Sequence, residues 1–347
     1  MKKRIDEINV LRAFACLSVV LVHISAIPVS TLRRSYVLMG FTVLNRAVKY
    51  TTPAFIFMSG LLLVYIYKDR EFNYFRFLKK RLKSTLIPYF IWTVIYYAYF
   101  IKRGYYVFSL EFFMENLLLG KMSFHLYFIV TITQFYFLFG LIRYLFRKYN
   151  PHILLVGSFV INVLVIKYVH FKYTDRFFLQ YIFFFTLGGY ISIYIESFKA
   201  IIKRYKYPIL LGHGGIVAYY AYQYYQYQFL QRSVDGFIVN MTWFIFSFIS
   251  IVSLYGIAVW VTNRYKLLYK GFKEVSKASY YIYLSHPLVL TISNSFLKKV
   301  GILSISLRFV LNLIIVTGTV VSIAIIYTRI KETYFRNKKK RQVSTAK

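Results

Sequence analysis

Long apolar runs separated by short polar segments constrain this fold more than any other feature of the sequence. Hydrophobic residues make up 59% of the chain and charged residues only 16%, whereas a soluble domain is roughly 45–50% apolar. A helix of about 20 apolar residues crosses the roughly 30 Å hydrocarbon core of a bilayer, and about ten runs approach that length. They cover residues 8–28, 48–67, 84–101, 123–143, 153–169, 177–196, 208–225, 237–261, 278–297 and 305–328. The sequence therefore predicts an all-α integral membrane protein with about ten transmembrane helices, a multi-pass protein of the cell membrane.

Basic residues between the runs predict how the chain is oriented in the membrane. There are 45 Lys and Arg residues against 11 Asp and Glu, a net charge of +34. With the N-terminus in the cytoplasm, the inner segments hold about 30 of these cations and the outer segments about 13, as the positive-inside rule requires. Both termini are then cytoplasmic, with a transmembrane domain over residues 1–335 and a basic tail over residues 336–347. The cations form no stripe interleaved with stacking aromatics, so nucleic acid is not an expected partner.

Two ionisable residues interrupt the first apolar run. Arg12 and His23 are eleven residues apart, which is three helical turns plus about 20°, so their side chains share one face about 16 Å apart. Arg12 is expected toward the cytoplasmic boundary and His23 toward the outer one. An ionisable residue within a span marks a functional site by default, because its burial needs a partner, water or a ligand. The alternatives are a snorkelling arginine and a neutral interfacial histidine.

A cluster of cations lies just before the third run. The cluster consists of Arg76, Lys79, Lys80, Arg81 and Lys83, and its spacing places cations on several sides of a short cytoplasmic helix. Ordinary positive-inside charge is one explanation. The other is a binding site for an anionic cytoplasmic donor such as the phosphates of a coenzyme A thioester, for which Arg offers a bidentate fork and Lys a point charge.

Three further positions are candidates for the acceptor side or for supporting roles. His125 lies at the start of the fourth run, and His286 lies in the ninth run, where Pro287 is expected to loosen the backbone. Ser59 precedes Gly60, and this pair of small residues permits another helix to approach closely. Each histidine alone also fits a structural role. The Tyr-rich residues 219–231 fit either an interfacial aromatic belt or a set of aromatic faces for sugar rings.

An ordered set of motifs carries a resemblance that covers nearly the whole chain. An Arg and a His separated by ten residues in the first run are followed by P-x-F-x-x-x-S-G over residues 53–60, K-K-R-x-x-x-x-x-I-P-Y-F over 79–90, H-L-Y-F over 125–128 and Y-x-x-Y-L-x-H-P over 280–287. This set resembles acyltransferase family 3, the membrane-bound O-acyltransferases of carbohydrates. The short layout and the E-N-L-L-L-G stretch over residues 115–120 resemble the Gram-positive branch linked to modification or export of surface and biofilm polysaccharides such as poly-N-acetylglucosamine.

The resemblance implies an enzyme that moves an acyl group, acetyl or succinyl, from a cytoplasmic acyl-CoA to a hydroxyl of a cell-surface polysaccharide. Arg12 and His23 match the family's functional arginine and histidine. As a hypothesis, Arg12 and the cation cluster hold the donor, while His23 is the general base or proton shuttle. Acyl-CoA is then a co-substrate, and no metal and no tightly bound cofactor are expected. The expected partners are the carbohydrate acceptor, the lipid bilayer and a polysaccharide synthase complex.

The sequence departs from the family pattern beside both of these residues. Asn9 stands where many members have an acidic residue, so Arg12 lacks that partner. A carboxylate that orients His23 has to come from the outer-side acids, which are Glu111, Glu115, Asp175 and Asp235. Two other functions stay open, an exporter of a surface polysaccharide such as poly-N-acetylglucosamine and a non-enzymatic subunit that recruits a glycosyltransferase. No acidic residue falls in the middle of a predicted span, which disfavours a proton-coupled carrier.

Overall fold

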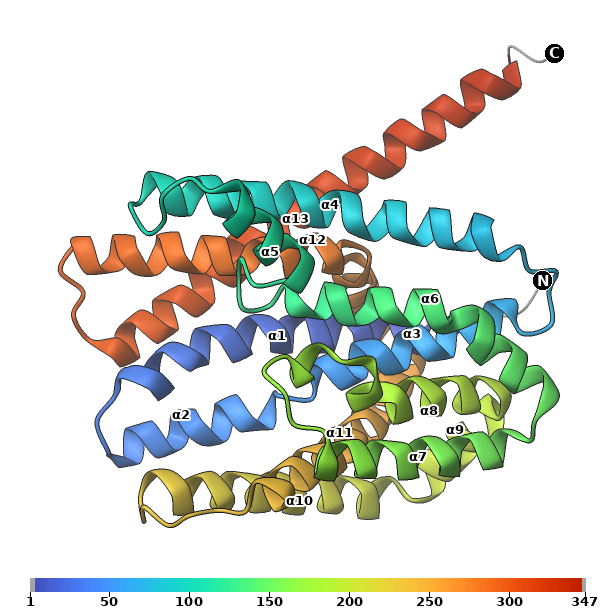
Figure 1. Cartoon of the computed structure of the whole chain (residues 1–347), viewed down its shortest axis with the longest axis horizontal. Helices are drawn as coiled ribbons and strands as arrows, with labels where there is room; N and C mark the ends of the chain where they lie inside the picture. The colour runs from blue at the N-terminus through green and yellow to red at the C-terminus, as the bar shows by residue number, and fades with distance from the viewer. Residues whose placement is uncertain (1–3, 345–347) are drawn as a thin grey trace.

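The computed structural model describes residues 4–344, and all the regular structure in this part of the chain is helical (Figure 1). The helices are α1 (Glu7–Thr31), α2 (Tyr36–Ala47), α3 (Thr51–Tyr67), α4 (Tyr74–Lys102), α5 (Leu110–Leu119), α6 (Tyr127–Lys148), α7 (Pro151–Tyr168), α8 (Ile182–Ile193), α9 (Ile195–Arg204), α10 (Lys206–Gln228), α11 (Gly236–Arg264), α12 (Lys266–Lys299) and α13 (Ile305–Ser344). Two short 3₁₀ turns, Thr174–Arg176 and Phe178–Tyr181, precede α8. The prediction of an all-α, multi-pass membrane protein is confirmed.

Fewer helices pass a simple length-and-hydropathy criterion for crossing a bilayer than the ten runs that the sequence predicted. Seven helical segments of the described chain are long and apolar enough to cross a bilayer, with α2 and α3 counted as one, and the count rises to eight if the pair formed by α8 and α9, bent by 98°, is one span. The predicted ranges 208–225 and 278–297 fall on α10 and α12, which do not meet that standard. Tyr and Gln residues lower the hydropathy of α10. In α12, polar residues are tolerated because they are buried inside the bundle, among them Ser276, Ser279, His286 and Ser293.

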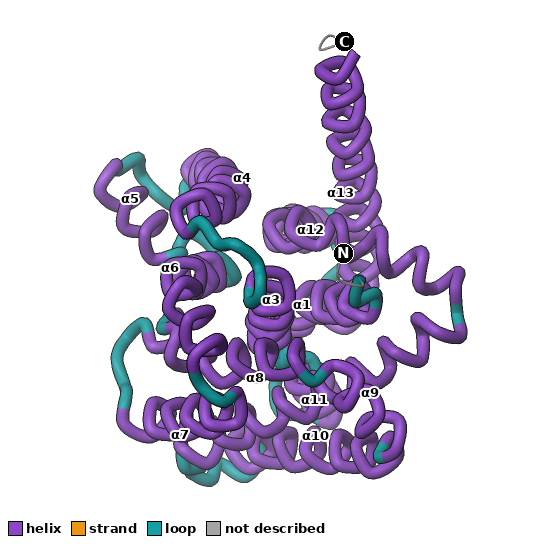
Figure 2. The backbone as a smooth tube through the Cα atoms, turned by 90° about the vertical axis from the view of Figure 1, so that its right-hand side faces the viewer, coloured by secondary structure: helices purple, strands orange, loops and turns teal. Residues whose placement is uncertain are grey.

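Helix α1 lies in the middle of the bundle. It contacts α2, α3, α11, α12 and α13, and the end-on view in Figure 2 places α1 and α3 between α12 on one side and α8 and α11 on the other. Most of the length of α1 is buried, including Leu11, Ala15 and Val20. Arg12 and His23 therefore lie on a core helix, where a charged or polar side chain needs a partner or a cavity.

Helices α3 and α8 touch backbone to backbone at two glycines. A Cβ at Gly60 of α3 would lie 2.1 Å from the carbonyl oxygen of Phe185, and a Cβ at Gly188 of α8 would lie 2.1 Å from the carbonyl oxygen of Phe57. No other residue fits at such distances, so these glycines permit the close approach of α3 and α8. The prediction that the small pair at residues 59–60 permits close approach of another helix is confirmed.

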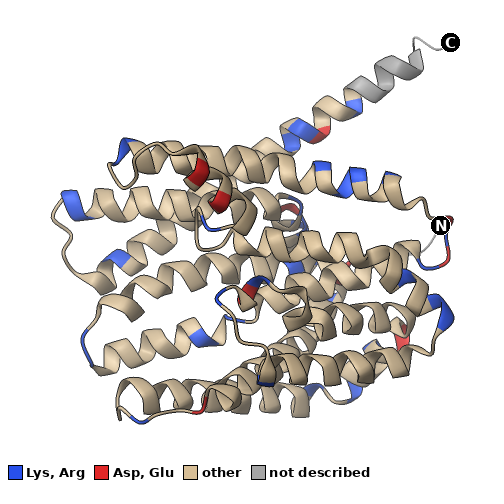
Figure 3. Cartoon of the chain, viewed as in Figure 1, with Lys and Arg blue, Asp and Glu red and all other residues tan. Residues whose placement is uncertain are grey.

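Both ends of the described chain lie at the same end of the bundle, at the right in Figure 1. Figure 3 shows that Lys and Arg gather toward the two ends of the helices, while the middle of the bundle is mostly uncharged. That the end with both termini faces the cytoplasm stays a prediction. Helix α13 continues without a break through residue 335, the predicted domain boundary, and residues 345–347 of the predicted tail lie outside the described residues.

Candidate active site

Three histidines that are far apart in the sequence meet inside the bundle. His23 comes from α1, His125 from the segment between α5 and α6, and His286 from α12. The ring centroids of His23 and His286 are 5.2 Å apart with the rings stacked, those of His125 and His286 are 5.3 Å apart, and those of His23 and His125 are 6.4 Å apart. His125 and His286 are buried, while His23 keeps part of its surface accessible. The sequence named all three residues, and the structure places them in one cluster.

The segment that carries His125 is a buried loop tied down by local features. Gly120 ends α5 with a φ of +62°, and a Cβ there would lie 2.9 Å from the carbonyl oxygen of Leu126, so the turn requires glycine. The hydroxyl of Tyr283, from α12, donates to the carbonyl of His125. The Nδ1 of His125 lies 3.1 Å from the hydroxyl of Ser123. Non-helical backbone at this depth is tolerated because it is buried in protein and lines a cavity.

Pro287 lies inside the continuous helix α12, beside His286. Proline has no N–H to donate, and the hydroxyl of Tyr96, from α4, joins the helix at this point. It donates to the carbonyl of Leu284 over 2.9 Å and accepts from the N–H of Leu288 over 3.1 Å. Leu284 and Leu288 are one helical turn apart and flank the proline, so one polar side chain bridges the two backbone groups on either side of it.

The hydrogen bond of His286 assigns its tautomer. Its Nδ1 lies 3.1 Å from the carbonyl oxygen of Ile282. Because a carbonyl oxygen only accepts, the neutral ring carries its proton on Nδ1 and its lone pair on Nε2. The Nε2 atoms of His286 and His125 are buried and have no hydrogen-bond partner among the described residues. The cluster therefore holds polar ring atoms that no group in the described part of the chain satisfies.

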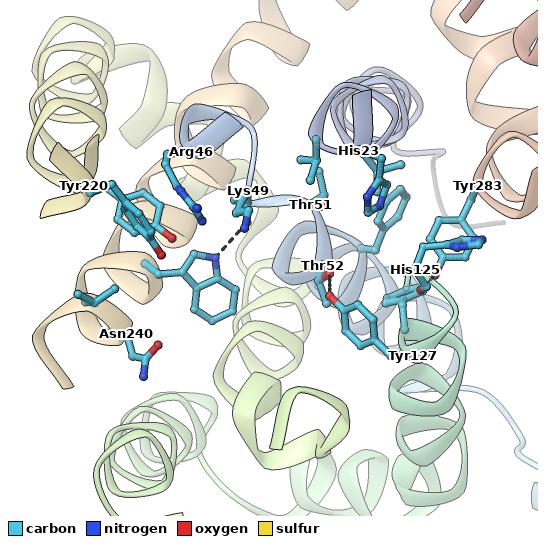
Figure 4. A pocket seen from close by; sticks show the side chains of 17 residues that line it. His23, Arg46, Lys49, Thr51, Thr52, His125, Tyr127, Tyr220, Asn240 and Tyr283 are labelled. Carbon is cyan, nitrogen blue, oxygen red and sulfur yellow. Dashed lines mark hydrogen bonds between the residues drawn. The ribbon is translucent and has the colours of Figure 1, made fainter. Parts of the chain in front are cut away.

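A chamber of about 350 Å³ adjoins the histidine cluster (Figure 4). His23 and His125 line it together with residues that sequence reasoning did not select. The latter include Arg46, Lys49, Thr52, Asn240 and Trp243, and the chamber is also lined by Tyr127 and by Tyr220 and Tyr224 of α10. Arg46 and Lys49 lie at the join between α2 and α3, where the sequence reads as a boundary of an apolar run. The tyrosines of α10 belong to the Tyr-rich segment, so its reading as aromatic faces around a substrate fits their position.

None of the outer-side carboxylates orients His23 within the part of the chain that the structure describes, and none lines the chamber. Asp235 accepts from the backbone N–H groups of Phe237 and Ile238 at the start of α11. Lys121 lies 2.6 Å from Glu115 and holds the pKa of that carboxyl below its usual range. Asp175 pairs with Arg176 over 3.5 Å, and Glu111 is exposed on α5. The rings next to His23 are those of Phe124, His286 and His125.

A second cavity of about 350 Å³ surrounds Arg12 nearer the N-terminal end of α1. Arg4 and Arg70 also line it, and no Asp or Glu is among its described lining residues. Asn9, at the position where family members often carry an acid, lies within 3.4 Å of the hydroxyls of Tyr269 and Ser276. The face shared by Arg12 and His23 thus opens on two separate cavities, one at each end.

The predicted donor-binding cluster lies mostly on the surface. Helix α4 begins at Tyr74 and continues to Lys102, so the cluster occupies the first turns of a long helix, and the expectation of a separate short helix is wrong. Arg76, Lys79, Lys80 and Lys83 are exposed. Arg81 is half-buried, its guanidinium lies 5.7 Å from the Phe77 ring centre, and its charge acts on Arg12.

Ser59, the remaining predicted position, donates to the carbonyl of Phe55 over 2.9 Å. It lines neither the chamber beside the histidines nor the cavity around Arg12.

Comparisons with known proteins agree with the resemblance read from the motifs. The family model described as "Acyltransferase domain" matches residues 5–329. A Staphylococcus aureus (strain MSSA476) protein named "Probable poly-beta-1,6-N-acetyl-D-glucosamine export protein" is 28% identical over 354 residues, which cover 92% of this chain and 93% of that protein. A Staphylococcus epidermidis protein of the same name is 28% identical over 311 residues, covering 84% of this chain and 82% of that protein. No solved structure matches. With its family model spanning nearly the whole chain, this membrane protein belongs to acyltransferase family 3.

Proposed function

We propose that this protein is a membrane-bound O-acyltransferase that moves an acyl group from a cytoplasmic acyl-CoA to a hydroxyl of a cell-surface carbohydrate. The observation that carries the proposal is the meeting of His23, His125 and His286 beside a chamber, with a separate arginine-lined cavity around Arg12. Family membership supports the reaction class. The two cavities provide the separate donor and acceptor ends that transfer across a membrane requires.

The cavity around Arg12 suits the anionic end of the donor. Arg4, Arg12 and Arg70 line it, and Arg81 is near enough for its charge to act on Arg12. Guanidinium groups bind phosphate oxygens with two parallel hydrogen bonds. With phosphates at this cavity, the pantetheine arm of acyl-CoA has to reach about 16 Å along α1 to bring its thioester to His23. Among the predicted donor-binding residues, Arg81 has the placement that supports a direct role.

In the proposed reaction, His23 takes the proton of the acceptor hydroxyl while its oxygen attacks the thioester carbonyl carbon. The carbon–sulfur bond then breaks, an ester remains on the acceptor, and the thiolate receives the proton from His23. General-base assistance of this kind contributes typically about 10²–10⁴ in rate. The stacked ring of His286 and the ring of His125 limit how the His23 ring can turn, so we assign them positioning roles.

A second candidate function is export of a surface polysaccharide. The printed names of the staphylococcal relatives, "Probable poly-beta-1,6-N-acetyl-D-glucosamine export protein", favour it. An exporter has to provide a passage for a polymer, and its activity does not depend on a general base. Replacing His23 therefore separates the two functions, because it removes the base without blocking a passage.

The test measures ester groups on surface polysaccharide from cells that lack this protein. The cells are complemented with the native chain, with His23→Ala, or with Ser59→Ala as a matched control outside both cavities, after equal membrane accumulation is verified. The transferase predicts that O-acyl groups are lost while polymer is still exported, and that the native chain and Ser59→Ala restore them but His23→Ala does not. Polymer retained inside the cell with unchanged ester content would instead establish the exporter.

A further inference from the structure

The chamber beside the histidines has two chemically different halves. His23 and His125 lie on one side of it in Figure 4, and Arg46 and Lys49 lie on the other, with Thr51 and Thr52 between them. The histidine half holds the groups that the proposed reaction uses. The cationic half has no role in that reaction, although its residues also belong to a membrane-spanning segment.

Among the residues that the structure describes, no carboxylate balances the cations of the chamber. The guanidinium of Arg46 lies 3.6 Å from the ring centre of Tyr224, and its Nε is buried without a hydrogen-bond partner among the described residues. The backbone of Lys49 is held in place, because its carbonyl accepts from the indole N–H of Trp243 over 3.0 Å. None of the described residues that line the chamber is Asp or Glu. Charged side chains inside a membrane protein are normally paired with an opposite charge. This half of the chamber is therefore suited to receive an anion.

The anion site is close enough to the histidines for one molecule to reach both. Lys49 acts electrostatically on His23 as well as lining the same chamber. A volume of about 350 Å³ is near the lower end of small-molecule sites, which run from about 300 to 1,000 Å³. It suits one sugar unit with a charged substituent. Tyr220 and Trp243 offer aromatic faces on the same side, which sugar rings use for stacking.

We propose that the acceptor is an anionic sugar, whose carboxylate or phosphate binds Arg46 and Lys49 while one of its hydroxyls faces His23. This inference rests on the proposed acyltransferase function and names its acceptor class. The same two cations repel a cationic acceptor, such as a glucosamine polymer that has lost its N-acetyl groups. Specificity then comes both from attraction of the right acceptor and from repulsion of the wrong one.

The experiment uses the full-length protein in lipid nanodiscs and measures two quantities separately. Binding is measured by equilibrium dialysis with four probes: a glucuronate disaccharide, a glucose-6-phosphate disaccharide, the neutral glucose disaccharide, and a glucosamine disaccharide. Acyl transfer from acetyl-CoA and from succinyl-CoA to each probe is measured by release of the thiol. The first two probes distinguish a carboxylate from a phosphate as the recognised group.

The variants are Arg46→Gln and Lys49→Gln, with Lys299→Gln as the matched control. Lys299 is exposed at the end of α12 and lines none of these cavities. We expect native protein to bind an anionic disaccharide at least about tenfold more tightly than the neutral one. The reason is that the neutral disaccharide lacks a hydrogen bond to a charged group, and one such bond changes the dissociation constant by about this factor. Each chamber variant should remove most of that preference without weakening the neutral disaccharide, and the control should keep it. Two independent variants keep the test decisive if one of them fails to fold.

Each outcome bears on a different statement. Preference for an anionic probe that every folded chamber variant abolishes supports the inference. It does so even if no thiol is released, a result that would count against the transferase alone. Equal binding of neutral and anionic probes overturns the inference. It is also overturned if Arg46→Gln and Lys49→Gln reduce transfer from succinyl-CoA but not from acetyl-CoA, because the chamber cations would then bind the acyl group.

Discussion

Replacing Tyr96 by Phe tests how the bundle supports the proline in α12. The Tyr96 hydroxyl donates to the carbonyl of Leu284 and accepts from the N–H of Leu288, and Tyr96 is only 1% exposed. Phenylalanine keeps the ring but loses the hydroxyl's hydrogen bonds to both backbone groups, and water has little access to replace the hydroxyl. Hydrogen bonds inside membrane proteins average about 0.6 kcal/mol and reach about 1.7 kcal/mol. Losing two of them should lower the free energy of unfolding by about 1–3 kcal/mol.

The assay is unfolding of the purified protein in mixed micelles by titration with SDS, followed by circular dichroism. Tyr105→Phe is the matched control, because Tyr105 is 58% exposed and its hydroxyl has no hydrogen bond among the described residues. Acyl transfer should fall as well in Tyr96→Phe, because His286 lies between the two backbone groups that Tyr96 holds. Equal stability of the two variants would refute the reasoning, since it would mean that the Tyr96 hydroxyl contributes nothing at the proline.

Three other substitutions test the packing and the two cavities. Gly60→Ala places a Cβ 2.1 Å from a carbonyl oxygen of α8 and should lower the free energy of unfolding by at least about 1–3 kcal/mol in the same SDS titration. The control Gly157→Ala has open space around it and should raise the free energy of unfolding slightly. Gly120→Ala forces a side chain at a φ of +62° and should lower the free energy of unfolding by only about 1–2 kcal/mol. Because the His125 loop must then shift, kcat for acyl transfer should fall more than this loss of stability explains. An unchanged kcat would contradict a role for the loop in positioning His125. Arg12→Gln should raise the KM for acyl-CoA about tenfold or more in kinetic assays. The control Lys79→Gln, on the exposed face of α4, should change this KM less than about twofold. Equal effects of the two substitutions would argue against a specific donor cavity around Arg12.

The helices themselves were largely predictable from the sequence. Each of the predicted runs overlaps a helix, because a chain in hydrocarbon has to satisfy its backbone hydrogen bonds internally, although the start of the fourth run forms the non-helical loop that carries His125. Helices α10 and α12 fall below the hydropathy criterion for a physical reason. Polar residues such as His286 and Gln223 are buried against other helices rather than against lipid, and hydropathy along the sequence does not report which neighbour a side chain faces.

The candidate site was predictable in its parts but not as a whole. Helical periodicity placed Arg12 and His23 on one face, and the structure puts a cavity beside each of them. His125 and His286 were each predicted as separate candidates, but the local sequence around them does not indicate that their rings lie beside His23. Arg46 and Lys49 were not predicted as site residues, because they lie at the edge of an apolar run. Basic residues are expected there simply to orient the chain in the membrane.

The sequence by itself determined the fold class, the core helix with its ionisable face, and the family. These follow from local properties, namely the length of apolar runs, the 3.6-residue period and the order of short motifs. Only the tertiary structure decided that the three histidines share one cluster and that two unbalanced cations face the same chamber. These contacts join residues such as His23 and His286 that are far apart in the chain, and they depend on close approaches like that of α3 and α8, where two glycines fix which helix faces meet.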